Sequence, residues 1–151
     1  MKNAFTMIEL IFVIVILGIL SAVALPKFSG MGTEAHIAKA RSDISSIRSS
    51  ILTERQSRLI KGDSSWISGL SQNQTTLFDG NDSDHTLLQY GIASGTTDGK
   101  WENTDGDPYK EYKFHIDNLD IVFDYNSTTG RFDCLNENSD DELDMCKDLV
   151  N

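Results

Sequence analysis

A carboxylate inside an apolar segment is the feature of this sequence with the clearest chemistry to explain. Glu9 carries the only charge between Phe5 and Leu25, and a helix over these residues is about 31 Å long, enough to cross a bilayer. A carboxylate near the centre of such a span costs about 2.5–3.5 kcal/mol, so it is rarely kept without a partner. Glu9 either reaches the interface and favours the positive end of the helix dipole, or pairs with a cation at the same depth.

Residue types that are used in catalysis do not form a recognisable site in the sequence. The three histidines, His36, His85 and His115, lack the spacing of a helical zinc pair. The sequence contains no Gly-x-Ser-x-Gly elbow and no phosphate-binding P-loop. Its many carboxylates are typical of solvated acidic loops. We therefore predict that the protein is not an enzyme and needs no catalytic cofactor.

Asn81 and Asn126 each begin an acceptor triplet of N-glycosylation. In both places an acidic residue, Asp79 or Asp124, precedes the asparagine by two positions, as in the extended acceptor of bacterial N-glycosylation. The alternative is a chance match, because loops rich in Asp, Asn, Ser and Thr often contain such triplets.

One long helix, predicted from about Phe5 to Ile60, is the first element that positions these residues. Pro26 should kink this helix rather than end it, because an amphipathic pattern resumes beyond the proline. Apolar residues at spacings of three and four form one stripe, which consists of Ile37, Ala40, Ile44, Ile47 and Ile51. Gly62 is a plausible C-cap. We assign residues 5–26 to a membrane or filament-core half and residues 27–61 to an amphipathic half.

The rest of the chain changes from loop to strand composition. Residues 62–108 are rich in Ser, Gly, Asn, Asp and Thr, which predicts a connecting region with at most short elements. In residues 109–134, apolar and polar residues alternate, as in strands. The alternating residues are Tyr112, Phe114 and Ile116, then Ile121, Phe123 and Tyr125, then Phe132 and Cys134. Turns are predicted at Asp117-Asn118 and over residues 126–130. We predict an α+β fold, with about three antiparallel strands packed on the isoleucine stripe of the helix.

The amino-terminal segment resembles the type IV pilin and pseudopilin superfamily, position by position over about 25 residues. The residues that carry the resemblance are Phe5-Thr6, Glu9-Leu10, Gly18-Ile19-Leu20, Ser21, Ala22, Ala24 and Pro26. Ala4 stands where the family usually has glycine. The resemblance implies that a prepilin peptidase removes the leader, residues 1–4, between Ala4 and Phe5 and methylates the new amine.

The resemblance also implies where the mature chain lies and what it contacts. The leader would face the cytoplasm, the helix would cross the bacterial inner membrane once, and the carboxy-terminal domain would be periplasmic. Assembly into a filament would depend on Phe5, Glu9, Gly18 and Pro26, with the amine of a neighbouring subunit paired to Glu9. The expected partners are further copies or other pilins, the peptidase, the inner-membrane assembly machinery and the membrane itself.

The predicted export of the domain suggests a disulfide, and the resemblance to pseudopilins suggests a metal site. Cys134 and Cys146 are the only cysteines, so the sequence predicts that they pair and enclose a loop and tail over residues 134–151. Asp105 and Asp107 resemble the segment before the sheet of major pseudopilins, some of which bind calcium. Another acidic group, Asp133, Glu137, Asp140, Asp141 and Asp144, lies near the cysteines. Solvated carboxylates are the alternative to calcium at both places.

The sequence therefore predicts a structural subunit of a type IV pilus-like filament. One alternative is a pseudopilin of type II secretion or DNA uptake, acting in a short periplasmic filament. Another is a periplasmic binding domain that uses the helix only as a membrane tether. The net charge of −10 argues against a basic nucleic-acid surface, so direct nucleic-acid binding is not expected.

Overall fold

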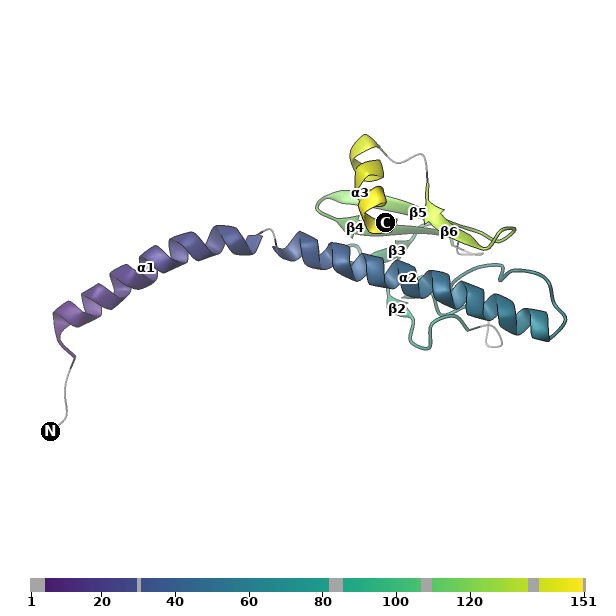
Figure 1. Cartoon of the computed structure of the whole chain (residues 1–151), viewed down its shortest axis with the longest axis horizontal. Helices are drawn as coiled ribbons and strands as arrows, with labels where there is room; N and C mark the ends of the chain where they lie inside the picture. The colour runs from purple at the N-terminus through teal and green to yellow at the C-terminus, as the bar shows by residue number, and fades with distance from the viewer. Residues whose placement is uncertain (1–4, 30, 82–85, 107–109, 136–138, 151) are drawn as a thin grey trace. The chain divides into compact units, whose positions relative to one another are not determined.

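A computed structural model describes residues 5–29, 31–81, 86–106, 110–135 and 139–150 of the chain. It divides into an amino-terminal unit that reaches Ala35 and a second unit that begins at His36. The elements follow the order α1, α2, β1, β2, β3, β4, β5, β6, α3 (Figure 1).

Helix α1 spans Met7–Ser29, and helix α2 spans Met31–Ile60. The expected single helix is thus two helices, and Gly30 between them lies outside the described residues. Pro26 lies within the range of α1, so the prediction that the helix continues past this proline is confirmed.

Within the second unit, α2 presents the predicted apolar stripe to the core. Ala40, Ile44, Ile47 and Ile51 are all buried, and Ile37 packs against them. The helix ends in a Schellman motif, in which Gly62 N donates to Leu59 O (3.1 Å) and Asp63 N donates to Arg58 O (2.9 Å). Gly62 has φ +86°, so the predicted C-cap is confirmed.

The main sheet has four antiparallel strands in the order β3-β4-β5-β6. They are Trp101–Asn103, Glu111–Ile116, Leu119–Asn126 and Arg131–Cys134. Figure 1 shows α2 running along one side of this sheet. Asp117 and Asn118 form the two-residue turn between β4 and β5, with φ of 50° and 64°, as the predicted turn requires. The alternation predicted for residues 109–134 therefore corresponds to β4, β5 and β6.

Four elements were not predicted individually: helix α3, and three short strands in the connecting region, where at most short elements were expected. Strand β3 is a fourth strand of the sheet, and β1 (Thr76–Leu77) pairs with β2 (Ile92–Ala93) in a separate two-stranded ladder. These strands have two or three residues each, too few for alternation to be visible in the sequence. The carboxy-terminal segment, expected as a loop and tail, contains helix α3 over Asp140–Val150.

Helix α3 has a capping box that sequence reasoning missed. Ser139 donates from its backbone nitrogen (2.7 Å) and from Oγ (2.8 Å) to Oε2 of Glu142. The helix buries Leu149 in the core, and a disulfide joins its Cys146 to Cys134 at the end of β6. The disulfide therefore fastens a helix to the edge strand of the sheet instead of closing an irregular tail.

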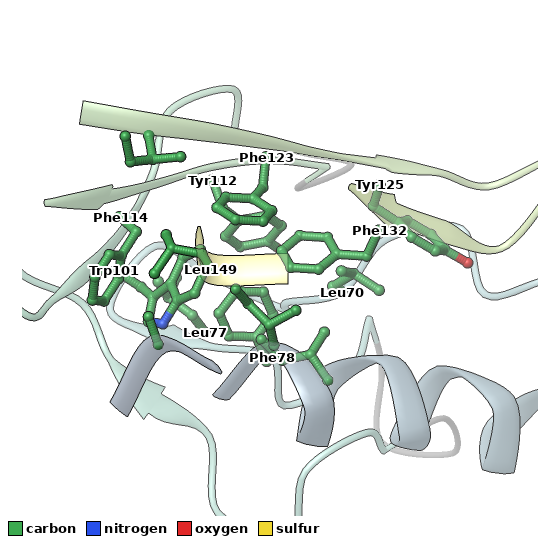
Figure 2. Packing of buried hydrophobic residues seen from close by; sticks show 14 of the residues in the cluster. Leu70, Leu77, Phe78, Trp101, Tyr112, Phe114, Phe123, Tyr125, Phe132 and Leu149 are labelled. Carbon is green, nitrogen blue, oxygen red and sulfur yellow. The ribbon is translucent and has the colours of Figure 1, made fainter. Parts of the chain in front are cut away.

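Aromatic side chains fill the core of the second unit (Figure 2). Phe78 lies among them, with ring centroids 4.4 Å from Tyr112, 5.5 Å from Trp101 and 5.8 Å from Phe132. Its backbone has φ 61°, an unusual value for a non-glycine residue. Phe78 N donates to Ser71 Oγ (3.0 Å), and Phe78 O accepts from Leu88 N (3.0 Å). The connecting region thus supplies part of the core.

Charged groups at the edge of this core attach α2 to the sheet. Arg48 donates from Nε to Phe132 O (3.0 Å) and from Nη2 to Asp133 Oδ1 (2.7 Å). Trp101 Nε1 donates to Asp43 Oδ2 (3.0 Å). These bonds fix α2 relative to both edge strands of the sheet, β3 and β6.

We expect Gly130→Ala to be much more destabilising than Gly62→Ala, although both glycines have positive φ, of +73° and +86°. Alanine in this region costs roughly 1–2 kcal/mol in either case. A Cβ added at Gly130 would also lie 2.2 Å from the ring of Trp66. A Cβ added at Gly62 would have none of the described atoms within 4 Å. Thermal unfolding of the two variants measures the difference, and equal losses would contradict the packing assigned to Trp66.

Burial raises the pKa of Tyr125 to about 12 from 10.0, and its hydroxyl donates to Ile67 O (2.9 Å). A pKa that is raised in the folded state stabilises the folded chain below pH 10, and this stabilisation, at most about 3 kcal/mol for a shift of two pKa units, should be lost as the pH rises from 10 to 12. Tyr125→Phe should cost about 1 kcal/mol at neutral pH and show a shallower loss over this range. Urea unfolding at successive pH values tests the difference, which would be absent if Tyr125 titrated normally.

Reduction of the disulfide, or a Cys134→Ala/Cys146→Ala double substitution, should lower the free energy of unfolding by about 2–3 kcal/mol. The estimate follows from closing a short loop in the unfolded chain. Melting of the oxidised, reduced and doubly substituted chains provides the measurement. Two free thiols in protein purified without reductant would show that the bond does not form.

Candidate assembly and processing site

The amino-terminal helix contains a span that is long and apolar enough to cross a membrane. This span is Met7–Ala24, with 18 residues, and no part of it is buried by the described chain. At 1.5 Å per residue it is about 27 Å long, close to the thickness of the hydrocarbon core. In water these side chains would all be exposed, so lipid or other apolar helices must cover them.

Glu9 lies in the first turn of α1 and bonds to the residue before the helix. Thr6 donates to Glu9 Oε2 from its backbone nitrogen and from Oγ1, both at 2.8 Å. Glu9 N donates in return to Thr6 Oγ1 (3.3 Å). This arrangement is a capping box, with Thr6 as the N-cap and Glu9 as the third helical residue. It satisfies helix-end donors that would otherwise face an apolar phase.

Phe5 and Glu9 lie on the same face of the amino-terminal segment. Together with Ile8, Phe12 and Val13 they line an open hollow of about 370 Å³. Phe5 itself is 83% exposed. Ala4, the other residue of the expected cleavage site, lies outside the described residues. An amine created at Phe5 would therefore be near the carboxylate of its own chain.

Farther along α1, small residues leave the helix surface open. A Cβ added at Gly18 would meet none of the described atoms within 4 Å. The hydroxyl of Ser21 donates to Leu17 O (2.7 Å), so its polar group is satisfied within the helix. Both features permit a second helix to approach closely. Pro26 lies in the same helix, five residues beyond Ser21.

Among the described residues, those considered for calcium are not grouped into a metal site. Asp105 Oδ1 accepts from Asn103 Nδ2 (2.8 Å), and its Oδ2 accepts from Lys110 N (2.9 Å). Asp107 lies outside the described residues. Among the residues that the structure describes, no three His, Cys, Asp or Glu side chains are grouped to hold a metal ion. Asp105 therefore acts, in the described structure, as a loop-stabilising acceptor.

Of the histidines, His115 has the most polar surroundings. Its Nδ1 lies 2.6 Å from Asp120 Oδ1 and its Nε2 lies 3.2 Å from Glu102 Oε2. The two carboxylates belong to the neighbouring strands β5 and β3, so the histidine links three strands of the sheet. His36 lies against Gly99, and His85 is outside the described residues. The described histidines thus have structural neighbours that account for them.

The two predicted glycosylation asparagines lie in different surroundings. Asn126 is exposed at the end of β5, whereas Asn81 is half-buried in the loop after β1. Of the triplets that begin at Asn81 and Asn126, only residues 126–128 are described in full.

Thr6 is the functional residue that sequence reasoning missed. The pattern Thr6-Met-Ile-Glu9 before an apolar run is a capping-box signal, and it could have been recognised without the structure. Without the capping box, the sequence offers two explanations for Glu9, the helix dipole and an ion pair; the structure adds capping as a third.

Comparison with known proteins identifies the same amino-terminal segment. Residues 1–25 match a family model described as the prokaryotic N-terminal methylation motif. No curated protein and no solved structure matches the chain. The match and the single apolar helix are consistent with a membrane-anchored precursor of the pilin type. The chain therefore carries the prepilin-type processing signal of the type IV pilin and pseudopilin superfamily.

Proposed function

We propose that this protein is a structural subunit of a type IV pilus-like filament, stored in the inner membrane and assembled through α1. The observation that carries the proposal is an apolar helix with an uncovered 18-residue span, which bears the methylation motif and the single carboxylate Glu9. In the membrane, lipid covers this helix; in a filament, the same helices of neighbouring subunits replace the lipid.

Cleavage between Ala4 and Phe5 changes the electrostatics at the start of α1. It places a cationic amine at Phe5, on the face that also holds Glu9. Thr6 uses Oε2 of Glu9, and no hydrogen bond to Oε1 is present among the described residues. Oε1 is therefore available to accept from an amine without loss of the capping box. The amine of a neighbouring subunit at this oxygen would neutralise both charges in the apolar interior.

The small residues of α1 suit the same arrangement. At Gly18 a neighbouring backbone can approach without a side chain between the helices. Close approach matters because apolar helices in a lipid-like phase gain little from the hydrophobic effect and associate mainly by packing. A helix that served only as a tether would have no use for an ion pair in register with its neighbours.

Three substitutions separate the charge of Glu9 from its role as a cap. Glu9→Gln keeps a capping box because glutamine suits the third helical position, yet it removes the charge. Thr6→Ala keeps the charge and loses the cap, at a cost of about 1 kcal/mol, or about fivefold in an equilibrium. Glu9→Leu loses both. We expect both Glu9 variants to enter sheared filaments more than tenfold less than the unmodified chain, because an unpaired buried amine costs about 3–5 kcal/mol. Thr6→Ala should be affected much less.

Processing provides the control for these measurements. Each variant should still be inserted in the membrane, cleaved before Phe5 and methylated, as mass spectrometry of the mature chain would show. If Glu9→Gln entered filaments normally while Thr6→Ala did not, the cap and not the charge would be the assembly determinant. Normal incorporation of Glu9→Leu would contradict the filament role of Glu9 and favour a tether.

A further inference from the structure

The turn between β5 and β6 begins at an asparagine, Asn126, whose side chain is accessible to a modifying enzyme. Asn126 is exposed, and its Oδ1 accepts from the backbone nitrogens of Thr128 (2.9 Å) and Thr129 (3.1 Å). Its backbone oxygen accepts from Gly130 N (2.7 Å). These bonds hold the side chain in a fixed Asx-type orientation. Within the described part of the chain, Nδ2 of Asn126 has no hydrogen-bond acceptor.

The other residues of the acceptor pattern lie on the outer face of β5 or in the turn that follows it. Tyr125 is buried and bonds to Ile67 O, so the alternating Asp124 and Asn126 lie on the opposite face of β5. Thr128, two residues after the asparagine, is exposed. Asn126 and Thr128 are therefore both exposed, and the half-buried Asp124 lies on the same face of β5 as the asparagine.

There is also room beside Asn126. An open hollow of about 670 Å³ adjoins it, between the outward residues of β5 and β6 and helix α3. Its walls include Asp124, Arg131 and Lys147, which offer charged and hydrogen-bonding groups to a polyhydroxylated ligand. A sugar ring attached at Asn126 would not have to displace core side chains.

The second candidate, Asn81, lacks these properties. Its Nδ2 already donates to Ser68 Oγ, and its Oδ1 is buried. Asp79, two residues earlier, accepts from Gln72 N (3.1 Å). Modification of Asn81 in the folded chain would break the Ser68 bond and place a bulky group at a partly buried position.

We propose that Asn126, and not Asn81, is a site of N-linked glycosylation on the folded protein. The donor is an oligosaccharide linked to a lipid pyrophosphate. A bond forms between Nδ2 of Asn126 and the anomeric carbon of the sugar, and the bond from that carbon to the phosphate oxygen breaks. The lipid pyrophosphate leaves with the electron pair, and one amide proton passes to a base of the transferase. No oxidation or reduction is involved.

The test uses the full chain, co-expressed in bacteria with an oligosaccharyltransferase that recognises the extended acceptor and with its lipid-linked oligosaccharide donor. Intact-mass measurement should show the mass of one glycan, and peptide mapping should place it on Asn126. Asn126→Gln should abolish the added mass, and Asn81→Gln should leave it unchanged. Unmodified Asn126 or a glycan on Asn81 alone would overturn the proposal, and equal occupancy of both would overturn the selection by the folded structure.

Two threonine variants test whether misfolding, rather than loss of the acceptor triplet, could explain a missing glycan. Thr128→Ala keeps the backbone nitrogen that bonds to Asn126 but removes the acceptor hydroxyl, so it should lose the glycan with an unchanged melting curve. Thr129→Ala makes the same chemical change one residue later and should keep the glycan. Glycosylation that persisted in Thr128→Ala would contradict the assigned acceptor triplet.

The proposal requires the domain to reach the compartment of the transferase, and in that respect it rests on the proposed membrane orientation. A second, flexible acceptor peptide added after Asn151 distinguishes the two failures. If the added peptide is glycosylated and Asn126 is not, the glycosylation proposal is wrong. If neither is glycosylated, the domain does not reach the transferase, and both the proposed membrane orientation and glycosylation of Asn126 in the cell are contradicted.

Discussion

An apolar helix that the described chain leaves uncovered is the constraint on which the behaviour of this protein depends. The span Met7–Ala24 has the length of a bilayer core, and none of it is buried by other described residues. Such a helix needs either lipid or copies of itself around it. A subunit that can exchange one for the other can be stored in a membrane and then built into a filament.

The same constraint explains the polar residues at the start of α1. In an apolar phase, free backbone donors and a lone carboxylate are both costly. Thr6 and Glu9 satisfy each other with three hydrogen bonds of 2.8–3.3 Å. The capping box uses one oxygen of Glu9 and leaves the other for a cation. Helix capping by Glu9 is therefore compatible with the intersubunit pairing that we propose for the same side chain.

The second unit has a core of its own, in which distant segments meet. Ile44 and Ile47 come from α2, Phe123 comes from β5, and Phe78 comes from the connecting region. Arg48 and the disulfide add attachments at β6, where the sheet ends. The connecting region is polar in composition, yet it contributes Ile67, Leu70, Leu77, Phe78 and Trp101 to the buried core. A region can therefore be rich in loops and still be necessary for the stability of the core.

The sequence by itself determined the elements whose signals are local and repeated. These include the apolar span of α1, the stripe from Ile37 to Ile51, the strands β4 to β6 and the glycine at position 62. The alternation in residues 112–125 is long enough to specify both strands and the face that each buries. The capping boxes at Thr6 and Ser139 also follow from a local sequence pattern, a hydroxyl residue with glutamate three positions later.

Only the tertiary structure decided the elements that have no internal period. Strand β3 has three residues, and it is a strand because β4 supplies its hydrogen-bond partners. Phe78 adopts positive φ because Ser71, Leu88 and the surrounding rings hold it there. The difference between Asn81 and Asn126, which have the same acceptor pattern, likewise comes from burial and from Ser68. Periodicity records the face that an element buries, whereas contacts between distant segments leave no pattern in either segment alone.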